Sequence, residues 1–283
     1  MLTWRHVKPK SWVDGASILY CMGMVHAAYL YGEIAIAPWL VETYSVGTLK
    51  MCFYQLLALF FYVNVMGNIY MIITTNTTTT GKMLPTLLKP GWRFCYACEA
   101  NSPPRSFHCW TCNKCILKRD HHCMFTSQCI GHYNYRFYFW LVFYGWCGTV
   151  FCWTMSMPYV WSLLGEFSIW KLSYFIFPLF CFMLQLISFY TAVVTFITLL
   201  SFIFSFALFG LLCWHGSHIY KGQTTFESSH HIFDYDLGWR MNIVQSFGSK
   251  WYLTWVLPWL PSPIPGDGID FQTKSTFESS KDQ

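Results

Sequence analysis

The sequence predicts an all-α membrane protein with four transmembrane helices and a cysteine-rich loop between the second and the third. Only 11% of the 283 residues are Asp, Glu, Lys or Arg, whereas about a quarter of a typical soluble domain is charged. The chain also contains several apolar segments long enough to cross a bilayer, which takes about 20 mainly apolar residues. The missing charge therefore indicates a membrane protein rather than a large soluble core.

The predicted spans cover about Ala16–Leu40, Leu49–Ile73, Phe137–Leu164 and Ser173–Trp214. The first apolar run is too long for a cleavable signal peptide, so we expect it to remain as an anchor. The last is too long for one simple span, yet it contains neither Pro nor Gly between Leu179 and Phe209. We therefore expect a single long helix that tilts or projects beyond the bilayer, with Pro178 separating a short turn before it.

The placement of Lys and Arg predicts the orientation of these spans. The N-terminus holds Arg5, Lys8 and Lys10. The loop between spans two and three holds Lys82, Lys89, Arg93, Arg105, Lys114, Lys118 and Arg119. The other two loops are short and nearly neutral. Both termini and the cysteine-rich loop are therefore expected in the cytosol, and no basic block suggests nucleic acid as a partner.

Seven of the thirteen cysteines lie between positions 95 and 129, interleaved with three histidines. The cluster contains Cys95, Cys98, His108, Cys109, Cys112, Cys115, His121, His122, Cys123 and Cys129. Cysteine pairs two residues apart, with histidine at a distance, are typical of tetrahedral zinc sites. Two closed sites use eight of these ten side chains, and the remaining two are where chemistry would take place.

A disulfide framework is the rival use of so many cysteines. The interleaved histidines and the flanking Lys and Arg residues favour reduced thiols that face the cytosol. The other six cysteines lie within apolar segments, where cysteine behaves as a small hydrophobic residue, and they are given no chemical role. They are Cys21, Cys52, Cys147, Cys152, Cys181 and Cys213.

The cluster resembles that of the DHHC-type protein S-acyltransferases, or palmitoyltransferases. The matching residues are Cys95, Cys98, Pro104, Arg105, His108, Cys109, Cys112, Cys115, Asp120, His121, His122, Cys123, Cys129, Ile130, Gly131 and Asn134. Residues 224–227 are similar to the family's Thr-Thr-x-Glu motif, and residues 235–238 with Asn242 and Gly248 to its C-terminal signature. The predicted topology is also that of the family. The ending Ser262–Ile269 is similar to that of the divergent animal subgroup numbered twenty-four.

The resemblance implies two structural zinc ions, each bound by three cysteines and one histidine in interleaved order. The first site would use Cys95, Cys98, His108 and Cys115, and the second Cys109, Cys112, His122 and Cys129. Closed sites of this kind fold a loop that has little core of its own. Cys123 and His121 then remain without a metal, beside Asp120.

The resemblance further implies that Cys123 is a nucleophile, that His121 is its base and that Asp120 orients the histidine. Cys123 would take a fatty acyl chain from acyl-coenzyme A and pass it to a cysteine of a substrate protein at the cytosolic membrane face. Thr225 is expected to hydrogen-bond Asp120, and Asn242 to support the site. The bilayer and substrate proteins with accessible cysteines are the implied partners, and the endoplasmic reticulum or Golgi the implied location. The competing interpretation makes residues 120–123 mere zinc scaffolding.

Four regions follow from these assignments. Residues 1–73 form the N-terminus with spans one and two, 74–136 the zinc domain, 137–216 spans three and four, and 217–283 a cytosolic C-terminal segment. In the last region Trp251, Trp255 and Trp259 recur every four residues. This spacing predicts either an aromatic stripe at the membrane interface or a helix face buried in the protein core. The final residues, 274–283, are predicted to be disordered.

The chain departs from the family next to the nucleophile. Most members have Pro-Trp after the catalytic cysteine and Asn before the last zinc cysteine, whereas this chain has Met124, Phe125 and Gln128. Met124 lacks the fixed φ of proline, so the turn is expected to be looser. A catalytically weak, zinc-folded membrane adaptor is therefore an alternative function. A membrane redox or zinc sensor would leave the membrane and C-terminal motifs unexplained.

Overall fold

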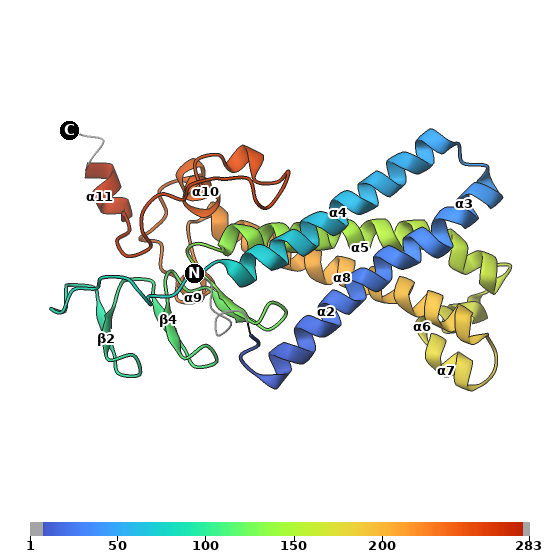
Figure 1. Cartoon of the computed structure of the whole chain (residues 1–283), viewed down its shortest axis with the longest axis horizontal. Coiled ribbons are helices and arrows are strands. Elements are labelled where there is room, and N and C mark those ends of the chain that lie inside the picture. The colour runs from blue at the N-terminus through green and yellow to red at the C-terminus, as the bar shows by residue number, and fades with distance from the viewer. Residues whose placement is uncertain (1–7, 280–283) are drawn as a thin grey trace. The chain divides into compact units, whose positions relative to one another are not determined.

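The structure is a computed structural model, and it describes residues 8–279. Arg5, part of the predicted orientation signal, lies outside the described residues. The chain forms two compact units. Of the described residues, the first unit contains 8–21, 66–141 and 212–279, and the second contains Met22–Val65 and Val142–Leu211. Long helices and short hairpins make up the fold (Figure 1).

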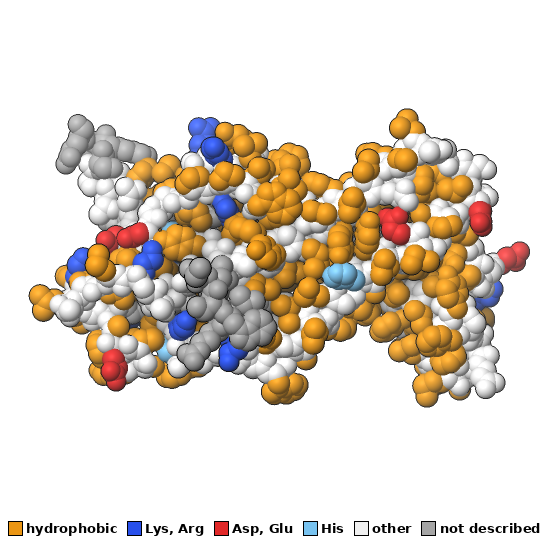
Figure 2. All heavy atoms as spheres, viewed as in Figure 1, with side chains coloured by type: hydrophobic (Ala, Val, Ile, Leu, Met, Phe, Trp, Pro, Cys, Tyr) orange, Lys and Arg blue, Asp and Glu red, His pale blue; other side chains and the backbone are white. Residues whose placement is uncertain are grey.

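Within residues 8–279, three helical stretches are long and apolar enough to cross a membrane: Trp12–Tyr44, Thr48–Thr74 and Phe189–Tyr220. They correspond to the first, second and fourth predicted spans. The third predicted span is also helical, α5 at Tyr135–Leu164, but its many Tyr and Trp residues keep its hydropathy below that of the other three. Hydrophobic side chains cover most of the visible surface of the long helices (Figure 2), as expected where lipid replaces water around a helix.

The first span is made of three consecutive pieces, α2 at Trp12–Tyr31, a π-helix at Gly32–Ile36 and α3 at Ala37–Tyr44. Pro38 lies in the first turn of α3 and has no N–H with which to continue the α-helical pattern. The π-helical turn at Gly32–Ile36, just before the proline, changes the hydrogen-bond pattern so that the missing N–H is tolerated. The second span is a single helix, α4 at Thr48–Thr74.

The fourth span is broken where the sequence predicts a continuous helix. A 3₁₀ turn at Ile169–Lys171 leads into α6 at Leu172–Ile176, α7 at Pro178–Met183 and α8 at Phe189–Tyr220. Pro178 begins α7, as expected, but the prediction of an unbroken helix from Leu179 is wrong. Gln185 has a φ of 59°, and the Ser188 hydroxyl accepts a hydrogen bond from the Thr191 N–H at 3.1 Å. Ser188 thus caps α8, a start signal that proline and glycine counting does not detect.

The described chain is mostly helical, as predicted, but the cysteine-rich loop contains three short β-hairpins that the all-α prediction did not include. The strands are β1 Arg93–Cys95, β2 Ala100–Ser102, β3 Phe107–Cys109, β4 Lys114–Ile116, β5 His121–Cys123 and β6 Gln128–Ile130. They pair antiparallel as β1–β2, β3–β4 and β5–β6. Each strand has only three residues, which is too short for an alternating apolar pattern to show.

The three hairpins are repeats of one unit that recurs every 14 residues. Cys95, Cys109 and Cys123 occupy equivalent positions at the end of the first strand. Four residues after each of them, the chain has a positive φ, at Glu99, Asn113 and Ser127. A left-handed residue at this point closes a tight turn, so each hairpin holds its cysteines in the same geometry.

The C-terminal segment contains α9 at Thr225–Ser229, α10 at Trp239–Phe247, a 3₁₀ turn at Trp251–Leu253 and α11 at Lys274–Ser279. The predicted disorder is therefore wrong for residues 274–279, and residues 280–283 lie outside the described residues. Trp251, Trp255 and Trp259 are 43%, 49% and 52% exposed. Their rings do not form a buried core face.

We expect Gly222→Ala to lower the thermal unfolding midpoint of the protein. Gly222 has a φ of +66°, and a Cβ there would lie 2.6 Å from the Tyr235 carbonyl oxygen and 2.8 Å from Asn242 Oδ1. Strain of this kind costs about 1–3 kcal/mol. Gly210→Ala is the matched control, because no atom lies within 4 Å of its Cβ position in α8. Equal unfolding midpoints for the two variants would contradict the conclusion that a side chain at position 222 strains the turn.

Candidate active site and metal centres

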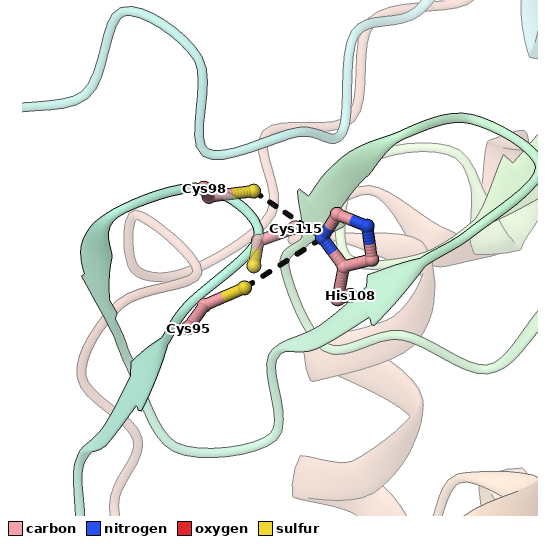
Figure 3. A group of neighbouring side chains, drawn as sticks. All are labelled: Cys95, Cys98, His108 and Cys115. Atoms are coloured by element: carbon pink, nitrogen blue, oxygen red, sulfur yellow. Dashed lines mark hydrogen bonds between the residues drawn. The ribbon is translucent and has the colours of Figure 1, made fainter.

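The first ligand set gathers around His108, between the first two hairpins. The Sγ atoms of Cys95 and Cys98 lie 3.6 and 3.3 Å from His108 Nδ1. Cys115 completes the group, and all four ligand atoms lie within 4.8 Å of one another. Figure 3 shows the three sulfur atoms converging on the ring nitrogen.

The second set has the same chemistry around His122. The Sγ atoms of Cys109, Cys112 and Cys129 lie 3.7, 3.3 and 3.5 Å from His122 Nδ1. Cys112 Sγ and Cys129 Sγ are 3.6 Å apart, far beyond the S–S bond length of about 2.05 Å. None of the described cysteines forms a disulfide, which argues against the rival framework.

Both sets fit tetrahedral zinc. With Zn–S at about 2.3 Å and Zn–N at about 2.0–2.1 Å, tetrahedral angles place S and N about 3.5 Å apart and two sulfurs about 3.8 Å apart. The observed S–N distances of 3.3–3.7 Å agree with this. Three soft thiolates and one imidazole also favour zinc over the hard cations. The eight side chains could therefore hold two zinc ions.

Each set takes its cysteine pair from one hairpin and its histidine and last cysteine from the next. No further hairpin follows the third as far as residue 279, where the described part of the chain ends. In the third hairpin, Thr126 also stands where the first two hairpins have Cys98 and Cys112. Cys123 thus occupies the position of a zinc ligand but lacks the second sulfur that would make a chelating pair.

Cys123 instead interacts with His121, which is hydrogen-bonded to Asp120. The His121 side chain stabilises the charged form of the Cys123 thiol. His121 Nδ1 lies 2.8 Å from Asp120 Oδ2. Asp120 also accepts hydrogen bonds from the Thr225 N–H and hydroxyl, both at 2.8 Å. The hydrogen bond from Thr225 that the resemblance implies is therefore present.

The electrostatics of the three groups favour a charged pair. Burial raises the pKa of Asp120, but the hydrogen bond and charge of His121 outweigh this and lower it to about 2. Burial lowers the pKa of His121, but hydrogen bonds with Asp120 and Cys123 raise it to about 9. Burial raises the pKa of Cys123, but His121 lowers it overall. A lowered thiol pKa favours the thiolate, which is the form of cysteine that acts as a nucleophile.

Comparison with known proteins decides the family. Residues 89–232 match the family model described as DHHC palmitoyltransferase. The chain belongs to the DHHC palmitoyltransferase family. A Danio rerio protein named probable palmitoyltransferase ZDHHC24 is 33% identical over 229 residues, which cover 77% of this chain and 75% of the relative. Proteins of the same name from Rattus norvegicus and Homo sapiens are each 32% identical, over 80% of this chain and 78% and 81% of their own lengths.

These findings confirm the family, the similarity to subgroup twenty-four and the enzyme class, protein S-palmitoyltransferase. The DHHC palmitoyltransferase motif Asp120–Cys123 coincides with the interacting group described above. The motif residues outside the zinc sets also have identifiable structural contacts. Asn134 donates to the Cys129 carbonyl at 2.9 Å and accepts from the Gly131 N–H at 2.8 Å, which closes the turn after the last cysteine.

A buried ion pair joins the cysteine-rich loop to the Thr-Thr-x-Glu segment. Arg105 donates to Glu227 through Nε at 2.7 Å and through a terminal nitrogen at 2.6 Å. It also donates to the Gly222 carbonyl at 2.9 Å. Thr224 and Glu227 form a capping box at the start of α9, so the same carboxylate both caps the helix and binds the arginine.

Asn242 supports the C-terminal segment at a distance from the reacting group. Its Nδ2 donates to the Tyr220 carbonyl at 2.8 Å and to Asp236 Oδ1 at 2.7 Å, and its Oδ1 accepts from the Leu237 N–H at 3.1 Å. These bonds fold the chain around Gly222. Asn242 therefore contributes to the turn that follows α8 and has no contact of its own with Asp120 among those described.

Sequence reasoning missed an aromatic group beside His121. The ring of Tyr138 packs edge-on against His121 with centroids 4.7 Å apart. His215, on α8, lies 3.0 Å from the Tyr135 hydroxyl through Nδ1 and 3.2 Å from the Tyr138 hydroxyl through Nε2. A histidine within an apolar stretch carries no local pattern that would assign it to this site.

We expect Thr225→Val to slow formation of the acyl-enzyme at Cys123. Valine keeps the backbone N–H and the side-chain shape but removes the hydroxyl that bonds Asp120. A hydrogen bond to a charged group contributes about 1.5–3 kcal/mol, so a loss of roughly tenfold or more is expected. Single-turnover acylation, with zinc content measured in parallel, provides the test. Thr225→Ser keeps the hydroxyl and is the control; equal rates for the two variants would contradict the role.

Proposed function

We propose that this palmitoyltransferase moves a fatty acyl chain from acyl-coenzyme A to protein cysteines through a thioester on Cys123. The observation that carries the proposal is that the seven cysteines of the loop fall into two groups, potential zinc ligands and a single free thiol. Six of the seven lie in two zinc-like sets. The seventh, Cys123, interacts with a histidine held by Asp120, and this histidine lowers the pKa of its thiol. A lone thiol with a base is the arrangement required for nucleophilic catalysis.

The proposed reaction consists of two thioester exchanges. The Cys123 thiolate attacks the carbonyl carbon of acyl-coenzyme A, the C–S bond to coenzyme A breaks, and the coenzyme A thiolate takes a proton from His121. A substrate thiol then loses its proton to His121 and attacks the Cys123 thioester, which releases the Cys123 thiolate. Asp120 holds the histidine ring and stabilises its charged form in both steps. One thioester replaces another, so no energy source is needed.

Zinc at the two ligand sets would join each hairpin to the next. The metal supplies structural cross-links, because four protein ligands leave no open position for a substrate. The chain's own residues then hold the nucleophile. Hairpin β5–β6 carries His122 and Cys129 for the second site and places Cys123 on the same strand, β5. The residues of the first site fix the preceding hairpins in the same way.

The proposed topology has four spans, with α5 as the third. The helix α5 has 30 residues, and a helix of that length at about 1.5 Å per residue exceeds the hydrocarbon core of about 30 Å. Four spans with both termini and the loop in the cytosol match the placement of Lys and Arg. The same proposal includes a location in the endoplasmic reticulum or Golgi and four regions, residues 1–73, 74–136, 137–216 and 217–283. This topology would bring Cys123 to the cytosolic face, where acyl-coenzyme A and substrate proteins are available.

The alternative, a catalytically weak adaptor, rests on the residues after the nucleophile. Met124 and Phe125 are 44% and 46% exposed, and the turn is closed by main-chain bonds from the Thr126 and Ser127 N–H groups, both at 3.3 Å. A turn held by two long hydrogen bonds and without proline is expected to position Cys123 less firmly. The interacting group of Asp120, His121 and Cys123 favours the enzyme.

Catalysis and zinc binding are expected to separate on mutation. Cys123→Ser is expected to abolish labelling by a clickable palmitate that hydroxylamine removes, while two zinc ions remain per chain. Cys112→Ser is expected to lower the zinc content and cause misfolding, because one missing ligand opens a closed site. Cys213→Ser, an exposed cysteine of α8, is the control and should change neither quantity. Loss of a full zinc equivalent in Cys123→Ser would show that the ligand assignment is wrong.

Restoring the family's usual residues is expected to speed acylation. The double variant Met124→Pro and Phe125→Trp should form the acyl-enzyme about two to five times faster. Proline at a compatible position reduces the conformational entropy that the chain loses on ordering, which contributes about 0.4–1 kcal/mol. The measurement is the single-turnover rate in the same lipid and at the same zinc content. A slower double variant would indicate that the turn of this chain is adapted to Met124.

A further inference from the structure

The N-terminal end of the first span contacts the second zinc-ligand set. Asp14 lies in the first turn of α2 and is 3% exposed. Its Oδ2 is 3.2 Å from His122 Nε2 and accepts a hydrogen bond from the Ser127 hydroxyl at 3.2 Å. The Lys10 N–H in turn donates to Ser127 Oγ at 3.0 Å. Residues 10–14 are thus joined to strand β5 and to the turn of hairpin β5–β6.

The two ring nitrogens of His122 have different partners. Nδ1 faces the three sulfur atoms, so Nε2 carries the proton when the ring acts as a ligand. A carboxylate that accepts this proton fixes the ring orientation and makes the ligand nitrogen more basic. Asp14 lies at hydrogen-bonding distance for this purpose, and its burial excludes competing water.

In the part of the chain that the structure describes, no such carboxylate contacts the histidine of the first ligand set. His108 likewise turns Nδ1 toward its sulfur atoms. Its Nε2 is buried, and among the described residues it has no hydrogen-bond partner. The two sets have the same donor atoms and the same hairpin geometry, so this difference isolates the contribution of Asp14.

We propose that Asp14 is a positioning residue for the second zinc site, and through His122 for the adjacent nucleophile. The inference rests on the proposed function, because it assumes that zinc binds His122 Nδ1. His122 and Cys123 are consecutive in β5, so a fixed imidazole also restrains the backbone that carries the thiol. The first span thereby acts on the active site through a charged side chain.

Zinc release tests the inference on the purified full chain. The wild-type protein, loaded with two zinc ions in lipid nanodiscs, is mixed with excess of a chromogenic chelator. In Asp14→Ala one of the two ions is expected to leave roughly 10–100-fold faster, and the other at its wild-type rate. Asp14→Asn keeps an acceptor oxygen without the charge, so a smaller acceleration of the same ion is expected. The rate of acyl-enzyme formation should fall most in Asp14→Ala and less in Asp14→Asn.

Ser11→Ala is the matched control. Ser11 Oγ caps the same helix by accepting the Asp14 N–H at 3.1 Å, so its loss weakens the start of α2 without removing the carboxylate. Release of both ions at wild-type rates is expected in this variant. Unchanged release from both Asp14 variants would overturn the inference alone, as would equal acceleration of both ions. Wild-type protein that binds no zinc would overturn the proposed metal sites together with it.

Discussion

The carboxylate of Asp120 is the point at which hairpin β5–β6 and the C-terminal segment are held together. It is buried, and a buried carboxylate is costly unless hydrogen-bond donors surround it. Its donors are the ring of His121 and two groups of Thr225, a residue about a hundred positions further along the chain. The geometry around Cys123, the proposed nucleophile, therefore depends on a segment that follows α8. The buried pair of Arg105 and Glu227 reinforces the same contact, because breaking such a pair leaves an uncompensated charge.

The same dependence explains what sequence reasoning could and could not find. Cysteine and histidine spacings predict the two ligand sets because a metal constrains spacing locally, within one or two hairpins. The contact between Thr225 and Asp120 followed from the family resemblance and could not come from spacing. Asp14 and His215 reach the site only through the fold, and each looks like an ordinary residue of an apolar helix. No local pattern marks such positions.

The fold itself was predictable where periodicity and length dominate. Long apolar helices were found from composition, although α5 is less apolar than its length suggests. The break before α8 was missed because a serine cap and a left-handed glutamine end a helix without proline or glycine. The three hairpins were missed because turns and metal ligands, rather than strand periodicity, determine them. Their 14-residue repeat is visible in the sequence once Cys95, Cys109 and Cys123 are aligned.

The replacement of a cysteine by Thr126 in the third hairpin bears on chemical selectivity. Under the proposed assignment six sulfur atoms of the loop are shared with a metal, and metal-bound thiolates react slowly with soft electrophiles. Cys123 is followed by the same turn, with a left-handed residue four positions later, but has no competing cation. A covalent inhibitor that resembles the acyl donor would therefore meet one reactive sulfur among seven, and its selectivity would come from coordination chemistry rather than from the shape of a pocket.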